Sequence, residues 1–169
     1  MASLLRFIFL IVFALHWGGL TFYTGFVVRI SHNVLSNPMD GGLITQRATS
    51  VLELLSLVSL VLMALNCVHV MRHSRRLGYC LAGCIVLLGL SLLGLFVVHG
   101  QLDAVIDERV YEVVRRDVFD TGHRRYKQLV TIHWVVSLAY LLTTTIAWKS
   151  IDTRRHVLSA HPDAENTQS

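Results

Sequence analysis

The chain alternates long hydrophobic blocks with shorter polar ones. Four blocks are almost entirely apolar, and they cover residues 4–28, 48–70, 79–98 and 129–148. A helix needs about 20 apolar residues to cross the ~30 Å hydrocarbon core of a bilayer, because each residue adds about 1.5 Å. The pattern therefore predicts an all-α fold, an integral membrane four-helix bundle, in one transmembrane domain over residues 1–150.

The stretch between the third and fourth blocks is polar, but its apolar residues are regularly spaced. They recur at intervals of three and four, at Leu102, Val105, Ile106, Val110, Val113, Val114 and Val118. This spacing is typical of an amphipathic helix, so we expect an extra helix over residues 101–120, on the membrane surface or continuing the third span. Residues 151–169 show no such period, and their polar composition predicts a disordered tail.

Composition agrees with a membrane location. The 169 residues are 53% hydrophobic and 15% charged, whereas about a quarter of the residues in a soluble domain are charged. We therefore expect the lipid bilayer to surround the chain. The formal net charge is +4, but the bases lie at the ends of the apolar blocks and not along an aromatic face, so no nucleic acid partner is expected.

The loop between the second and third spans indicates the orientation. It contains Arg72, Arg75 and Arg76 with no acid beside them. Basic residues in short loops favour the cytoplasmic side, and the bases of the long polar stretch can pair with acids there. We therefore expect a multi-pass protein of the cell membrane with this loop and both termini in the cytoplasm.

The first span contains residues suited to contact with another helix. Gly18 and Gly25 are seven residues apart and so share a helix face, where small side chains permit close backbone approach in lipid. We expect this face to pack against another helix. His16 lies near mid-depth, where ionisable groups are costly, and we expect its imidazole to bond to a neighbouring helix, with a ligand or proton-relay role as the alternative.

A group of histidines and acids is predicted at one membrane boundary. The candidates are Glu53, His99, Asp103, His123 and His133. His99 and Asp103 are four residues apart and stack on one helix face, and Asp107 joins them if the third helix continues. Glu53 and His133 lie near the start of their spans, with His123 just before one of them. A carboxylate inside the boundary needs partners, so we expect a common cavity.

Three interpretations of this group remain open. Imidazoles and carboxylates from several helices form metal sites in bundles, and two histidines can hold a haem. Under this hypothesis the metal ligands are His99, Asp103, His123, His133 and Glu53. A polar network that joins the helix ends, or a path for protons or solutes, fits the same residues. The spacings Glu-x-x-His, Cys-x-x-Cys-His and His-Glu-x-x-His are absent from the sequence.

The first half of the chain carries a family resemblance. The run Trp17-Gly18-Gly19, Phe22 and Gly25-Phe26-Val27-Val28 is followed, across a polar turn, by Gly42-Leu43-Ile44 and a second apolar span. This pattern resembles a group of small bacterial four-helix membrane proteins, with no assigned function, that are similar to the transmembrane-protein-205-like proteins. The resemblance covers residues 17–60, with a weaker match at Phe119, His123 and Tyr126. It implies a four-helix fold and no particular chemistry.

Two functions follow from the sequence. No nucleophile and base lie in a recognisable catalytic context, which favours a non-enzymatic membrane protein whose helices pack with each other, with a membrane protein partner or with a second copy. The alternative is a metal- or haem-binding bundle in redox or ion handling, built on the histidine and acid group.

Overall fold

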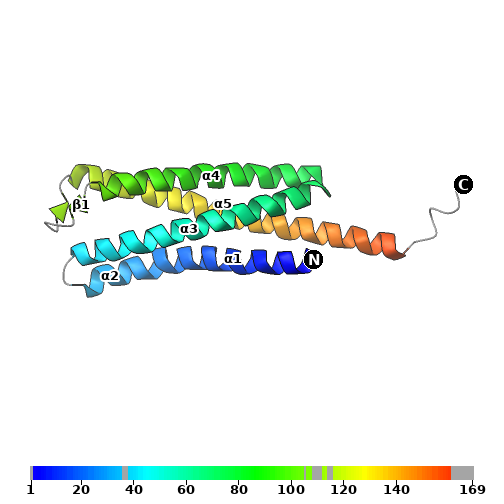
Figure 1. Ribbon diagram of the computed structural model, residues 1–169, viewed down its shortest axis with the longest axis horizontal. Helices are drawn as coiled ribbons and strands as arrows, with labels where there is room; N and C mark the ends of the chain where they lie inside the picture. The colour runs from blue at the N-terminus through cyan, green and yellow to red at the C-terminus, as the bar shows by residue number, and fades with distance from the viewer. Residues whose placement is uncertain (1, 36–37, 105, 108–111, 114–115, 161–169) are drawn as a thin grey trace, which may run out of the picture.

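Four long helices lie side by side in this computed structural model, which describes residues 2–35, 38–104, 106–107, 112–113 and 116–160. In chain order they are α1 (Ala2–Phe22), which continues through the π-helical turn η1 (Tyr23–Val27) into α2 (Val28–Val34), then α3 (Pro38–Met71), α4 (Arg75–Asp103) and α5 (Arg116–Ala160). Figure 1 shows the N-terminus at the same end of the bundle as the α3–α4 turn. The predicted all-α four-helix bundle is confirmed.

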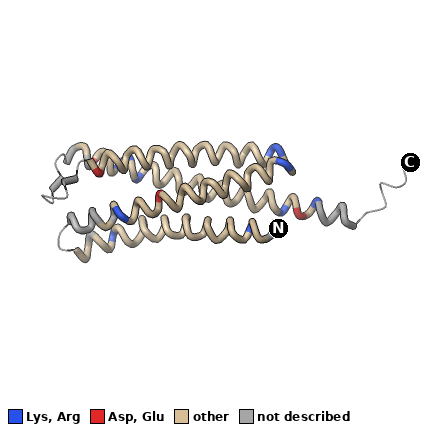
Figure 2. Tube along the Cα trace, viewed as in Figure 1, with Lys and Arg blue, Asp and Glu red and all other residues tan. Residues whose placement is uncertain are grey.

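The first predicted apolar block runs through α1 and η1 to the start of α2, and α3, α4 and α5 each contain one of the other three. By length and composition, four helices can cross a membrane, at Leu4–Ser31, Gln46–Met71, Arg75–Asp103 and Asp120–Arg154. Their outward faces expose large apolar side chains along most of their length. Charged residues gather toward the ends of the bundle, as Figure 2 shows. A bilayer can solvate such a surface, since its interior accepts apolar side chains and helices that satisfy their own backbone.

The buried positions follow a spacing of alternating three and four residues. On α5 the repeat runs through Val130, His133, Ser137, Tyr140, Thr144, Ala147 and Ile151, with Trp148 buried beside it, and on α1 and the start of η1 it runs through Phe9, Phe13, His16, Leu20 and Tyr23. A sustained 3-4 repeat keeps one seam of a helix against its neighbours, as in left-handed bundles. Helix α4 packs along both α3 and α5, and α1 packs chiefly along α3.

Close helix contacts occur at glycines other than the predicted pair. A Cβ built on Gly18 or Gly25 would meet no atom within 4 Å, whereas one on Gly94 would lie 3.0 Å from the Leu129 side chain of α5. Gly19 lies against Leu52 of α3, at 3.4 Å by the same measure. The prediction that Gly18 and Gly25 pack against another helix is therefore wrong within this chain. Their spacing identified a shared face but not its direction, because a lipid-facing helix is apolar all round.

The connection between α4 and α5 is not the predicted extra helix. Helix α4 ends at Asp103, and strands β1 (Ile106–Asp107) and β2 (Glu112–Val113) pair antiparallel before α5 begins at Arg116. The prediction of a helix over 101–120 is wrong for these described residues, and positions 105, 108–111 and 114–115 lie outside them. The valines and isoleucine that supplied the helical period are β-branched, and such residues favour strands.

The C-terminal prediction also needs correction. Helix α5 continues to Ala160, so residues 151–160 are helical and not disordered, while residues 161–169 lie outside the described part. Ile151 is buried in the core, and Asp152 forms an ion pair with Arg6 of α1. These contacts stabilise α5 beyond the end of its apolar block.

Candidate functional site

Polar side chains inside the bundle form three layers along its length. The Glu53 layer, nearest the α4–α5 connection, consists of Gln46, Glu53, His99 and Asp103. The histidine layer, deeper in the bundle, consists of His16, Ser56, Ser91 and His133. The Asn66 layer, toward the α3–α4 turn, consists of Asn66, Tyr140, Thr144 and Trp148.

His99 stands at the centre of the Glu53 layer, between two carboxylates. Its Nδ1 lies 3.0 Å from Oε2 of Glu53 on α3, and its Nε2 lies 3.5 Å from Oδ1 of Asp103, one turn along α4. Asp103 also accepts a hydrogen bond of 2.9 Å from the Gln46 amide of α3. The structure thus brings Glu53, His99 and Asp103 together, as their depth and spacing predicted, in a line that joins α3 to α4.

Several atoms of this layer are buried without a hydrogen-bond partner among the described residues. They are Oε1 of Glu53, Nε2 of His99 and Oε1 of Gln46. The Glu53 side chain is 5% exposed and that of His99 is 11% exposed, whereas that of Asp103 is 41% exposed. Unpaired polar atoms away from water are destabilising. The layer therefore has polar atoms that can still form hydrogen bonds, and they lie further inside the bundle than the accessible carboxylate of Asp103.

His133 belongs to the histidine layer and not to the Glu53 layer. Its Nδ1 lies 2.8 Å from Oγ of Ser91 on α4, and its ring meets that of His16 edge to face, with centroids 5.3 Å apart. Nδ1 of His16 in turn lies 3.1 Å from Oγ of Ser56 on α3. The expected bond from His16 to a neighbouring helix is confirmed.

The structure places His133 about one helical turn further into the bundle than Glu53. His133 reaches α3 through His16 and Ser56, and Ser56 lies about 4.5 Å along the helix axis beyond Glu53. The cavity shared with Glu53 stays a prediction. The apolar block begins at residue 129, so hydropathy alone does not show that α5 already begins at Arg116.

The serines of the histidine layer also reach carbonyl oxygens of their own helices. Oγ of Ser56 lies 2.7 Å from the oxygen of Leu52, and Oγ of Ser91 lies 2.9 Å from that of Leu88. A hydroxyl has one hydrogen, so a serine that donates it to the carbonyl accepts from the imidazole Nδ1–H. In this arrangement the serines fix the rings and are not nucleophiles, because an activated serine donates its hydrogen to the imidazole.

The Asn66 layer is fully paired. The Asn66 amide donates to the Tyr140 hydroxyl at 3.0 Å and to Oγ1 of Thr144 at 3.2 Å, and its oxygen accepts from the Trp148 indole at 3.0 Å. The Tyr140 hydroxyl then donates to the carbonyl of Met63 at 2.6 Å. All four side chains of the layer are buried. This arrangement fastens α3 to α5 with neutral groups alone.

Two further contacts fasten α1 to α5. The indole of Trp134 donates to Oγ1 of Thr21 at 2.8 Å, and its ring stacks on Trp17 with centroids 5.0 Å apart. Near the other end, the Arg6 guanidinium binds both carboxylate oxygens of Asp152, at 2.7 and 2.9 Å. Such bidentate pairing fixes the geometry of both side chains.

The five predicted metal ligands do not form one site. Among the residues that the structure describes, no group of three or more His, Cys, Asp or Glu is placed to hold a metal ion. Glu53 and Asp103 approach opposite nitrogens of the His99 ring, so the three side chains do not converge on a point. His133 is in the deeper layer, and His123 lies on α5 one turn before Tyr126, whose ring contacts His99.

The buried histidine pair does not fit a haem either. A bis-histidine haem needs its porphyrin between the two imidazoles. The rings of His16 and His133 are in direct contact, with an angle of 79° between their planes, and each Nδ1 is within hydrogen-bond distance of a serine. This packing leaves no room for a porphyrin between them.

Sequence reasoning missed the Asn66 layer and the serines of the histidine layer. A signal for the Tyr140 and Thr144 part of the Asn66 layer exists in the spacing of α5, where His133, Ser137, Tyr140 and Thr144 occupy successive positions of the 3-4 repeat. Polar residues at such positions lie at helix contacts and not on the lipid side.

Comparison of the chain with protein-family models, with curated proteins and with solved structures gave no match. The resemblance of residues 17–60 to the transmembrane-protein-205-like group therefore stays a prediction. Of the glycines that support it, Gly19 contacts α3, whereas Gly18 and Gly25 have open space beside them.

Proposed function

We propose that this chain is a multi-pass protein of the cell membrane that acts through helix packing, within its own bundle and with a partner subunit, and that it is not an enzyme. Its four long apolar helices support this proposal, and so do the apolar side chains on their outer faces. The bilayer is the environment that such a surface requires.

The observation behind the proposal is that buried polar groups bond from helix to helix. His16 and Ser56 join α1 to α3, Glu53 and His99 join α3 to α4, Ser91 and His133 join α4 to α5, and the Asn66 layer joins α3 to α5. In lipid, apolar contact alone gives little drive for helix association, so packing and interhelical hydrogen bonds must supply it. Under this proposal the polar groups serve to assemble the helices.

The surface of α1 and η1 around Gly18 and Gly25 supports a partner role. A side chain at either glycine would meet open space. On the adjoining turns, Phe22 and Phe26 stack on each other with centroids 5.8 Å apart and are 61% and 58% exposed. A shallow strip beside exposed aromatic rings lets another helix approach closely. A second copy of this chain suits it, because one patch can meet itself across a two-fold axis.

The mass of the purified protein in detergent, measured by light scattering, tests this role. We expect a dimer for the natural chain and a monomer for the double variant Gly18→Leu/Gly25→Leu, with little change in thermal stability. The matched control is Gly83→Leu/Gly89→Leu on α4, where an added Cβ also meets nothing within 4 Å. A monomeric natural chain, or equal dissociation by both variants, would contradict the proposed partner face.

We further propose that both termini lie in the cytoplasm and the α4–α5 connection lies outside. Arg72, Arg75 and Arg76 at the α3–α4 turn are exposed, and they support this orientation through the positive-inside rule. Reporter fusions at Ser169 and within residues 103–120 should give opposite signals, cytoplasmic for the first. The reverse pattern would show that the termini lie outside and the α4–α5 connection lies in the cytoplasm.

A second function, proton handling, is favoured by the Glu53 layer. An imidazole between two carboxylates can accept a proton on one nitrogen and release one from the other. Asp103 provides access at the bundle end, and the unpaired Oε1 of Glu53 lies inside. Liposomes that contain the protein and a pH-sensitive dye test this function. Glu53→Gln should abolish protein-dependent proton uptake, and uptake equal to that of empty liposomes for the natural chain would exclude it.

A further inference from the structure

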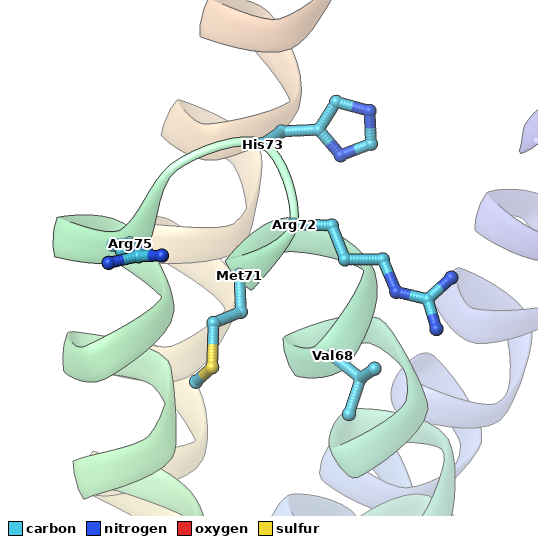
Figure 3. Close-up of a pocket in the computed structure, with 5 residues that line it drawn as sticks. All are labelled: Val68, Met71, Arg72, His73 and Arg75. Atoms are coloured by element: carbon cyan, nitrogen blue, oxygen red, sulfur yellow. The ribbon is translucent and has the colours of Figure 1, made fainter.

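We propose that the turn between α3 and α4 binds the phosphate headgroup of an anionic phospholipid. A surface pocket of about 360 Å³ lies at this turn and is lined by Val68, Met71, Arg72, His73 and Arg75. Figure 3 shows Arg72 and Arg75 on opposite sides of the turn, with the apolar Met71 and Val68 below. The pocket thus has a cationic rim and an apolar wall.

Among the residues that the structure describes, the bases at this end of the bundle outnumber the acids. Arg72, Arg75 and Arg76 are all exposed, and α5 brings Arg154 to the same place, since its Nη1 lies 3.5 Å from the carbonyl oxygen of His73. Asp152 is the acid that the described residues place nearby, and it is bound by Arg6 through both oxygens.

The backbone adds to this preference for an anion. The first turn of α4 begins beside the pocket, and Ser74 provides no side-chain cap for its free N–H groups. Helix N-termini carry partial positive charge. The arginines, with guanidinium groups that bind phosphate oxygens in pairs, supply most of the attraction.

The apolar surroundings indicate a lipid and not free phosphate. The arginines lie at the ends of the spans Gln46–Met71 and Arg75–Asp103, which is the depth of lipid headgroups. Val68, which lines the pocket, is 52% exposed, and about one turn along the helices from lining residues, Leu65 of α3 and Tyr79 of α4 are 54% and 67% exposed. Acyl chains can lie along this surface while the phosphate meets the arginines. The cytoplasmic leaflet is rich in anionic lipid, which agrees with the proposed orientation.

Native mass spectrometry of the full chain measures this binding. Phosphatidylglycerol or phosphatidylcholine is added to the protein in detergent, and the lipid that stays bound after the detergent is removed is counted. We expect one phosphatidylglycerol to bind at least tenfold more tightly than phosphatidylcholine. Each arginine near a membrane surface contributes about 1 kcal/mol to binding an anionic lipid, so Arg72→Gln/Arg75→Gln should weaken phosphatidylglycerol binding about 25-fold. Both side chains are exposed, so the variant should fold.

The matched control is Arg124→Gln/Arg125→Gln, which removes two exposed arginines of α5 at the opposite end of the bundle. It should leave the affinity unchanged within about twofold, a difference smaller than the effect of one surface charge. Equal affinity for the two lipids, or an equal loss in both variants, would overturn the proposal. Displacement of phosphatidylglycerol by an equal concentration of inorganic phosphate would overturn the assignment to lipid. The test is independent of the proposed partner face, because it reads lipid bound to each chain.

Discussion

The Asn66 layer and the Glu53 layer both place polar side chains of α3 against a neighbouring helix, but they satisfy those side chains differently. In the Asn66 layer, the amide donates twice and accepts once, and each partner is neutral. In the Glu53 layer, two carboxylates meet one imidazole, and buried atoms of Glu53, His99 and Gln46 have no hydrogen-bond partner among the described residues.

The difference indicates separate roles for the two layers. A fully satisfied network contributes to packing and leaves nothing to bind. A partly satisfied ionisable network costs stability, and within membranes such residues mark functional sites. The position of Asp103, 41% exposed at the bundle end, gives the Glu53 layer access to water that the Asn66 layer lacks. We therefore expect substitutions in the first layer to affect stability and those in the second to affect proton handling.

The largest effect is expected from Asn66→Leu. This change removes the acceptor of the buried Trp148 indole and both bonds from the amide to α5. The free energy of unfolding should fall by about 2 kcal/mol, because a buried donor loses its partner along with several bonds. Denaturant titration in mixed micelles measures this difference. A loss below about 0.5 kcal/mol, the size of a weak interhelical bond, would show that the layer does not hold α3 to α5.

An intermediate effect is expected from Glu53→Leu, and almost none from Glu53→Gln. Leucine leaves Nδ1 of His99 without its partner, which should lower the unfolding free energy by about 1–2 kcal/mol. Glutamine keeps an acceptor oxygen, so the loss should stay within about 0.5 kcal/mol. The same micelle titration applies to both variants. If glutamine destabilises as much as leucine, an acceptor oxygen at this position is not enough for stability, and the contrast in role between the two layers would fail.

The smallest effect is expected in the histidine layer. Ser56→Ala or Ser91→Ala removes one contact to an imidazole and should lower the unfolding free energy by about 0.6 kcal/mol, the average for a hydrogen bond between membrane helices. Thr143→Ala provides a control, because that exposed hydroxyl bonds to a carbonyl of its own helix. Losses above about 2 kcal/mol would show that the histidine layer contributes as much to the free energy of unfolding as we expect of the Asn66 layer.

Much of the fold could be predicted because span length is a physical requirement of the bilayer. The four apolar blocks located the four helices, and the spacing of His99 and Asp103, with the equal depth of Glu53, brought those residues together. The partner of Glu53 was predictable because a carboxylate buried in a membrane helix needs a hydrogen-bonding group close to it.

The rest depended on where helices begin and which way they face. His133 was placed at the boundary because hydropathy marks the apolar block and not the polar turns of α5 before it. Gly18 and Gly25 were assigned to packing because nothing in an apolar sequence separates a lipid-facing side from a helix-facing side. Asn66 was missed because its partners are far along the chain, on α5.

A double-mutant cycle between Asn66 and Trp148 tests the central claim, that polar contacts join these helices within the membrane. Trp148→Phe removes the indole donor while it keeps an aromatic ring in place, and Asn66→Leu removes the acceptor. With the unfolding free energies of the four proteins measured in lipid bicelles, we expect a coupling energy of about 0.6–1.7 kcal/mol between the two sites. A coupling energy of zero would show that the two side chains contribute independently, and that the bond between Asn66 and Trp148 does not help to hold α3 to α5.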